Sequence, residues 1–242
     1  MLQMKLTAGG MILGFSLSAI TGCGPAGGPH AEYDLVDYLF PEQSGTLVYR
    51  RYVSQKPEGS NAFSEPKYLQ DSHQKVRRNG PVITVMVDGE SNRTYSVSDS
   101  SIAVEECNAT LHYHLKRKVA AHDNFVKESV IMETKESGNT SRITYACEMT
   151  DVAPSMKIES NPKTYEHIVH IRCVQDRKVS VKINGTQIAT VTERVEENDY
   201  AKGVGLIRSE RTWCDKVVID NGHQTDAGCT RTLDRIVTFV AE

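Results

Sequence analysis

The sequence predicts a mainly β protein, an antiparallel meander that forms an incomplete barrel or a curved sheet or sandwich, with a short N-terminal helix. Short runs of β-branched and aromatic residues recur along the 242-residue chain. Tight-turn sequences such as Asp88-Gly89, Asn184-Gly185 and Asn221-Gly222 follow several of them. No long stretch has the apolar spacing of a helix that would connect parallel strands. Consecutive strands are therefore expected to pair in antiparallel order.

The first expected element is one short amphipathic helix or turn within residues 33–40. Its apolar side chains lie near helical spacing and are Leu35, Val36, Leu39 and Phe40. Pro41 then ends the segment. The apolar side is expected to form a plug on the first strands.

The expected strands follow from residue 46 onward, with a long loop over residues 54–64, where Pro, Gly, Asn and Ser gather. Alternation and β-branched residues place them at residues 47–53, 82–87, 94–97, 110–119, 125–132, 142–147, 165–174, 178–183, 186–191, 201–208, 216–219 and 235–240.

The hairpin at residues 178–191 is the most specific local prediction. Asn184-Gly185 accepts the positive φ angles of a two-residue type I′ turn, which fixes the register of the two strands. Ile183 then faces Thr186, Val181 faces Ile188 and Val179 faces Thr190. This side is apolar and β-branched, so it is expected to pack against the protein core, while the other side is expected to face solvent.

The start of the sequence has the parts of a signal peptide. Residues 1–22 carry one charge, Lys5, an apolar run over residues 11–20, and the small residues Thr21 and Gly22. The apolar run is too short to cross a bilayer, which needs about 20 apolar residues.

The stretch from Leu17 to Cys23 resembles the lipobox of bacterial lipoproteins, in which the cysteine is acylated and becomes the first residue of the mature chain. The resemblance implies a signal peptide over residues 1–22 and a lipidated Cys23 with a flexible tether over 23–31. The length and the strand pattern of the remainder predict a single β-rich domain over 32–242. Gly24, in place of an aspartate, implies sorting to the outer membrane, facing the periplasm. An ordinary secretory signal that is cut elsewhere is the alternative.

A weaker resemblance joins the tether, the short helix and the long meander with its late Gly203-Val204-Gly205 sequence. Together they look like lipoproteins of the LolA/LolB-like type. That resemblance implies an incomplete barrel around an apolar cavity, with the glycines placed where a strand bends sharply.

The six cysteines are Cys23, Cys107, Cys147, Cys173, Cys214 and Cys229. With Cys23 assigned to lipid, five remain, which allows two disulfides and one further thiol. Cys214 and Cys229 are expected to pair, because the turn sequence between them folds one strand back beside the other. Cys107, Cys147 and Cys173 are left for one further pair, and no spacing chooses between them.

His112 and His114 share one side of an expected strand, a geometry that can bind zinc. Lys116 and Lys118 lie on the same side of the strand, and their positive charge would repel a metal cation. A solvated polar face is therefore favoured, and neither a metal site nor a cofactor is expected. His167 is expected at the core or its boundary.

Sequence motifs of the common hydrolases and nucleotide-binding enzymes, such as G-x-S-x-G, H-E-x-x-H and the Walker A loop, are missing. The pairs Glu105-Glu106 and Glu196-Glu197 are expected to be solvated charges whose side chains diverge. An enzyme with a site assembled from scattered residues is the least favoured of three functional interpretations.

The favoured interpretation is a non-enzymatic, lipid-anchored envelope protein that binds an apolar ligand or an envelope partner through a sheet surface or cavity. The alternative is a structural or assembly scaffold subunit of an envelope complex. The formal net charge of -3, with dispersed basic residues, excludes a nucleic-acid partner. An apolar cavity would favour the carrier, and a filled core with an exposed apolar patch would favour the scaffold.

Overall fold

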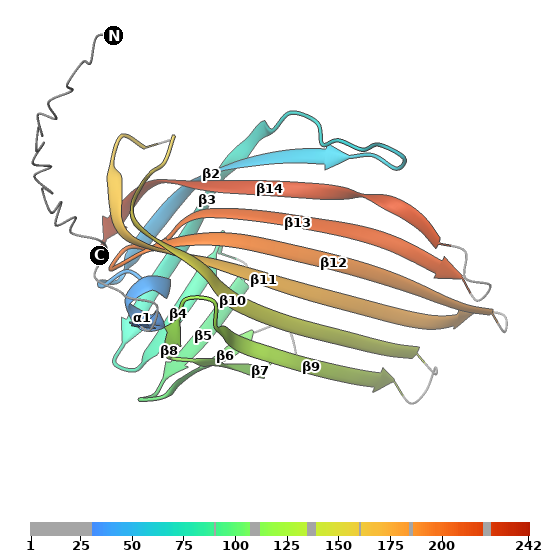
Figure 1. The fold of residues 1–242 in the computed structure, drawn as a ribbon, viewed down its shortest axis with the longest axis horizontal. Coiled ribbons are helices and arrows are strands. Elements are labelled where there is room, and N and C mark those ends of the chain that lie inside the picture. The colour runs from blue at the N-terminus through green and yellow to red at the C-terminus, as the bar shows by residue number, and fades with distance from the viewer. Residues whose placement is uncertain are drawn as a thin grey trace, which may run out of the picture.

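Strands account for most of the chain (Figure 1). The structure, a computed structural model, describes residues 31–89, 91–106, 112–134, 139–159, 161–183, 186–219 and 224–242. Cys23, with the expected anchor and tether, and Cys107 lie outside the described residues.

The elements follow one another along the chain as β1 (Glu32–Asp34), α1 (Leu35–Leu39), β2 (Gly45–Lys56), β3 (Lys67–Asn79), β4 (Val82–Val87), β5 (Ser91–Val97), β6 (Ser101–Glu106), β7 (His112–Lys116), β8 (Lys118–Ala120), β9 (Asn124–Thr134), β10 (Asn139–Lys157), β11 (Thr164–Ile183), β12 (Thr186–Ala201), β13 (Gly205–Ile219) and β14 (Gln224–Ala241).

One sheet of 12 strands forms a nearly closed, barrel-like wall. Its order is β7-β6-β5-β4-β3-β2-β14-β13-β12-β11-β10-β9. Each strand is antiparallel to its neighbours. The edge strands β7 and β9 lie side by side, and near this seam the rings of Tyr113 and Tyr145 have their centroids 5.2 Å apart. The expected mainly β, antiparallel fold is therefore confirmed.

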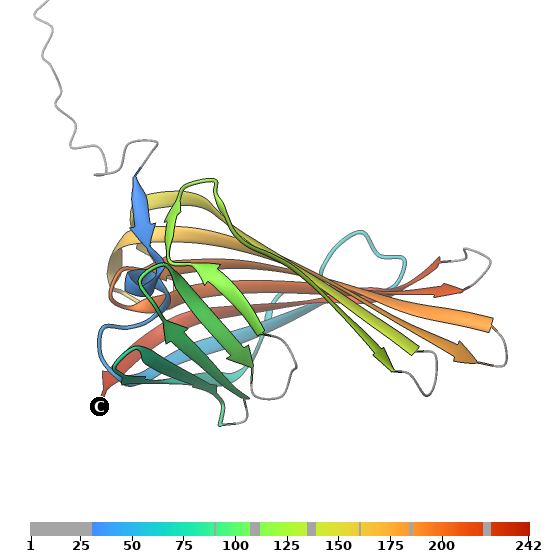
Figure 2. The ribbon, with the colours of Figure 1, turned by 90° about the horizontal axis from the view of Figure 1, so that it is seen from below.

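The strands from β10 to β14 are the longest, with 15 to 20 residues each. Figure 2 shows that their ends around the β11–β12 hairpin continue beyond the barrel as a single twisted layer. The sheet is thus a barrel on one side and an open layer on the other.

The register expected for residues 178–191 is confirmed. Ile183 pairs with Thr186, Val181 with Ile188 and Val179 with Thr190. The expected packing of the apolar side holds only in part, since Val181 and Ile188 are half-buried. They lie in the part of the strands that extends past the barrel.

The strand expected at residues 82–87 matches β4, and β2 extends the expected strand 47–53 as far as Lys56. The expected loop therefore begins later, at Pro57. The alternation expected at residues 110–119 breaks at Arg117, where β7 ends and β8 begins.

The strand expected over residues 201–208 is confirmed only from Gly205 onward, because residues 202–204 form the turn between β12 and β13. Gly203 and Gly205 have positive φ angles of 72° and 91°, which end the extended conformation. A Cβ atom on Gly203 would lie 2.8 Å from the Glu42 carboxylate. The Gly203 backbone instead contacts α1, donating to the Asp37 carbonyl at 2.7 Å, and accepts from the Glu42 amide at 3.0 Å in the segment after the helix.

The helix α1 is five residues long and lies in the stretch where one short helix or turn was expected. Asp34 caps its N-terminus by accepting from the Val36 amide at 3.1 Å. Arg117 donates to the same carboxylate at 2.9 Å, next to the small β1–β8 sheet. Leu35 is completely buried, so α1 closes one end of the barrel core.

Two disulfides link neighbouring strands. Cys214 on β13 is bonded to Cys229 on β14, which is the expected pair. Cys147 on β10 is bonded to Cys173 on β11, which resolves the open choice for the further pair. In both bridges the two cysteines are directly opposite in the strand register.

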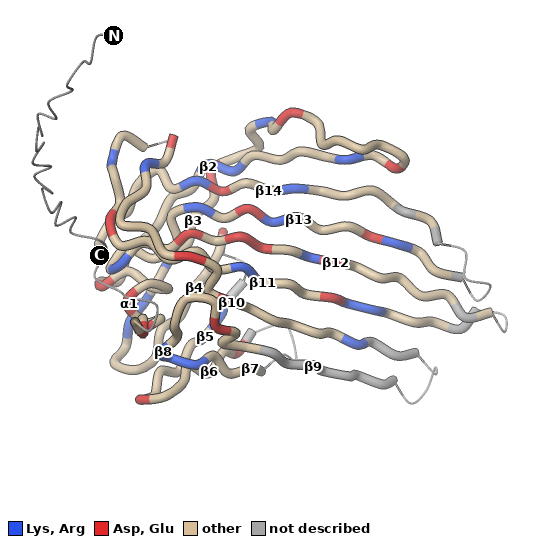
Figure 3. Tube along the Cα trace, viewed as in Figure 1, with Lys and Arg blue, Asp and Glu red and all other residues tan. Residues whose placement is uncertain are grey.

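Acidic and basic residues are interspersed along the strands (Figure 3). Among the described residues, no helix has the length and apolar character needed to cross a membrane.

Candidate ligand-binding cavity

The barrel contains a cavity of about 370 Å³. Alternate residues of the strands point into it, since successive side chains of a strand lie on opposite faces. On β12 these residues are Arg194, Glu196, Asn198 and Tyr200, at every second position.

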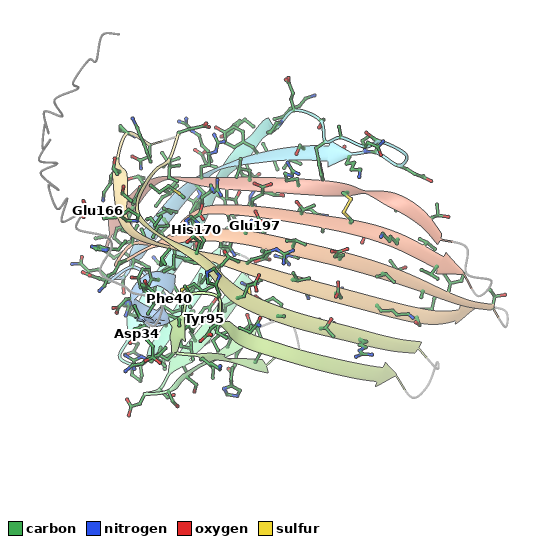
Figure 4. The ribbon with its side chains drawn as sticks, in the orientation of Figure 1. Asp34, Phe40, Tyr95, Glu166, His170 and Glu197 are labelled. Carbon is green, nitrogen blue, oxygen red and sulfur yellow. A yellow bond between two sulfur atoms is a disulfide. The ribbon has the colours of Figure 1, made fainter. Side chains whose placement is uncertain are left out.

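The apolar part of the wall comes from both the helical end and the sheet. Its side chains include Leu39, Phe40, Val85, Leu115, Phe125 and Ile171. The Phe40 ring packs edge-on against Tyr95 with the centroids 4.8 Å apart (Figure 4). The disulfide Cys147–Cys173 also lines this part, so neither sulfur is a free thiol.

Tyrosines also line the cavity, among them Tyr49, Tyr145 and Tyr200. Burial raises the pKa of Tyr145 and of Tyr200 far above the ordinary value for tyrosine. Burial also raises the pKa of Tyr49, whose hydroxyl lies 2.9 Å from the Leu206 carbonyl oxygen. These groups therefore stay protonated at physiological pH and act as hydrogen-bonding partners, not as bases.

The charged wall is centred on Asp234, whose side chain is only 7% exposed. Arg51 donates to both carboxylate oxygens, from Nε at 2.8 Å and from Nη2 at 3.1 Å. Arg211 donates to the same carboxylate from the next strand. Ser72 accepts from Arg51 at 3.0 Å and donates to Asp88 at 2.9 Å. The hydrogen bond to Asp234 raises the pKa of Arg51 and holds its charge in place.

A second ion pair in the wall joins Arg194 to Glu196 on β12. The sequence interpretation of Glu196 as a solvated charge is thus wrong, although Glu197 does diverge from it and is exposed. The described lining carries four arginines, Arg51, Arg93, Arg194 and Arg211, against two carboxylates, Glu196 and Asp234. The cavity is therefore amphipathic with a net positive wall, not purely apolar as the LolA/LolB-like resemblance implies.

A second hollow, of about 400 Å³, adjoins the cavity where the long strands leave the barrel. It is lined by Gln175, Arg177, Thr192, Arg194, Arg211 and Trp213. Arg194 and Arg211 line both hollows, so the two form one continuous concave surface.

No histidine is among the described residues that line this surface. His167 is exposed, with a φ of 52°, so its expected place in the core or at its boundary is wrong. His170 contacts Asp199 across β11 and β12, on the face opposite the cavity-lining Ile171 and Asn198. The hydrogen bond to Asp199 raises the pKa of His170. Arg208 also pairs with Asp199.

The two histidines considered for zinc lie at β7. His114 is exposed, and the side chain of His112 is not among those that the structure describes. Among the described residues, no three His, Cys, Asp or Glu side chains are grouped as metal ligands.

Comparisons of the chain with models of protein families, with curated proteins and with solved structures found no match.

Proposed function

We propose that this chain is a non-enzymatic carrier or binding protein that holds the apolar part of an amphipathic ligand inside its barrel. The observation that carries the proposal is the cavity of about 370 Å³, which is lined by both apolar and charged side chains. Sites for small molecules have volumes of about 300–1,000 Å³ and are mostly apolar with a few placed polar groups.

The chemistry of several wall residues supports binding in preference to catalysis. Burial raises the pKa of Tyr49, Tyr145 and Tyr200, so these hydroxyls keep their protons. The hydrogen bond to Asp234 raises the pKa of Arg51, which keeps its charge. Such groups orient a ligand and do not exchange protons with it. The Ser72 hydroxyl is held between Arg51 and Asp88. The cavity cysteines are locked in a disulfide.

A cavity-filling variant tests the proposal. Val87 lines the cavity, whereas Met86 beside it on β4 points to the opposite face. The neutral fluorophore N-phenyl-1-naphthylamine is expected to bind the unmodified chain and Met86→Trp alike. For Val87→Trp the affinity falls about tenfold or more, because the indole occupies the space of the probe. Circular dichroism checks that both variants keep their sheet. Equal binding by all three chains, or binding by none, contradicts the proposal.

A scaffold function is the second candidate. The half-buried apolar side chains of the β11–β12 hairpin, Val179, Val181 and Ile188, would then contact an envelope partner. Failure of the unmodified chain to bind any apolar probe would favour this candidate.

The proposal places the chain at the bacterial outer membrane, facing the periplasm and held by lipid on Cys23. Several acyl chains would hold it firmly, since each buried methylene contributes about 0.8 kcal/mol. The intact mass of the membrane-extracted protein is expected to equal that of a chain that starts at Cys23 and carries acyl groups. The variant Cys23→Ser is expected to appear in the soluble fraction. An unmodified N-terminus at another residue would contradict the anchor.

A further inference from the structure

Three arginines, Arg177, Arg194 and Arg211, line the second hollow at the mouth of the barrel. In the strand register, Arg177 on β11 pairs with Thr192, and Arg194 on β12 pairs with Gln175 on one side and with Trp213 on the other. Arg177 and Arg211 are therefore both diagonal neighbours of Arg194, at about 7–8 Å between backbones, which is within reach of long side chains. Arg177 and Arg194 can therefore reach one small group from neighbouring strands, while Arg211, on the opposite diagonal, holds Asp234 on β14.

The charges of these arginines are incompletely balanced. The described lining of this hollow contains three cations and no carboxylate. Arg194 and Arg211 each place Nη2 on a carboxylate, but the buried Nε of each has no hydrogen-bond partner among the described residues. Arg177 is exposed and forms no ion pair within the described part of the chain. Asp215 lies opposite Thr192, the register partner of Arg177, and its carboxylate accepts from the Thr192 hydroxyl at 2.6 Å.

We propose that Arg177 and Arg194 bind the anionic headgroup, a carboxylate or a phosphate, of an amphiphile whose chain lies in the barrel cavity. This inference rests on the proposed function and adds the class of ligand to it. Guanidinium groups present paired N–H donors that match both of these anions.

The continuity of the two hollows favours an amphiphile over a free anion. Arg194 lines both, so a headgroup held by it lies at the entrance of the barrel cavity. A chain attached to that headgroup extends toward Phe125 and Ile171 without crossing the sheet. Trp213 lies beside Arg194 and is the single tryptophan of the chain, so its fluorescence reports on this position.

Displacement of N-phenyl-1-naphthylamine tests the inference with two ligands of equal chain length, dodecanoate and dodecanol. Arg177→Gln removes a cation that has no ion pair within the described chain. Dodecanoate is expected to bind this variant about tenfold more weakly than the unmodified chain, because one charge-assisted hydrogen bond is lost. The affinity of this variant for dodecanol stays within about twofold of that of the unmodified chain, since the dodecanol hydroxyl carries no charge.

Raising the salt concentration is expected to weaken the binding of dodecanoate but not that of dodecanol.

Arg172→Gln is the matched control, because Arg172 lies on the same strand but on the opposite face, beside Glu197. Its binding of both ligands is expected to equal that of the unmodified chain. Dodecanoate is also expected to change the Trp213 emission of the unmodified chain.

The outcomes separate the inference from the function on which it rests. If the probe does not bind the unmodified chain, the proposed function fails. If the probe binds but Arg177→Gln weakens both ligands equally or neither, the headgroup site is overturned. Displacement by acetate or inorganic phosphate as effective as that by dodecanoate would identify a free-anion site and overturn the amphiphile.

Discussion

Asp234→Asn is expected to lower the free energy of unfolding by about 3 kcal/mol or more, because it leaves two largely buried guanidinium groups without their carboxylate. Arg51 and Arg211 both donate to Asp234, and the Asp234 side chain is 7% exposed. Asparagine keeps the shape of the side chain but removes its charge. Urea unfolding followed by circular dichroism measures the loss as a shift of the midpoint at constant slope.

Glu197→Gln is the control for this prediction. Glu197 is on β12 and lies 4.0 Å from Arg172, with both side chains well exposed. Exposed pairs of this kind contribute less than about 1 kcal/mol, so the control is expected to unfold almost like the unmodified chain. Equal, small losses for Asp234→Asn and Glu197→Gln would show that the buried network does not stabilise the barrel.

Removing the Cys147–Cys173 disulfide is expected to cost about 3.5 kcal/mol, from the entropy that the unfolded chain regains when a 26-residue link is opened. The variant is Cys147→Ala/Cys173→Ala. Both cysteines are buried in the wall of the cavity, so the variant is also expected to bind the naphthylamine probe more weakly.

The second disulfide provides the comparison. Cys214→Ala/Cys229→Ala opens a 15-residue link, which corresponds to about 3 kcal/mol. Trp213 points into the concave surface, so its neighbour Cys214 lies on the other face. This variant is expected to lose stability but to keep probe binding. Loss of binding in both variants, or in neither, would argue against a cavity bounded by Cys147 and Cys173.

The local β structure could be predicted from the sequence because short-range rules determine it. Asn184-Gly185 favours one turn type, and that turn fixes the pairing of Val181 with Ile188. The turn sequence after Val218 likewise brings Cys214 opposite Cys229. Where positive φ angles interrupt a strand, as at Gly203, the β-branched pattern alone predicted an extended segment wrongly.

The cavity wall could not be predicted from the sequence, for two reasons. Its polar residues come from distant parts of the sequence, and on strands such as β12 the residues that alternate with them are polar too. Asp234 and Arg51 are 183 residues apart. On β12 both faces are polar: Glu196 and Asn198 point into the cavity, while Glu197 and Asp199 point away. Alternation therefore carries no signal there, and Glu196 was interpreted as a surface charge. The barrel closure that brings these residues together is a property of the whole sheet.

Native mass spectrometry of the protein purified from its own membranes without added lipid tests the central claim, that the barrel holds an amphiphile, most directly. The expected spectrum contains a non-covalent complex that releases a small anionic amphiphile on activation, and Val87→Trp loses this complex while Met86→Trp keeps it. A spectrum of the unliganded chain alone, before and after incubation with dodecanoate, would contradict the claim.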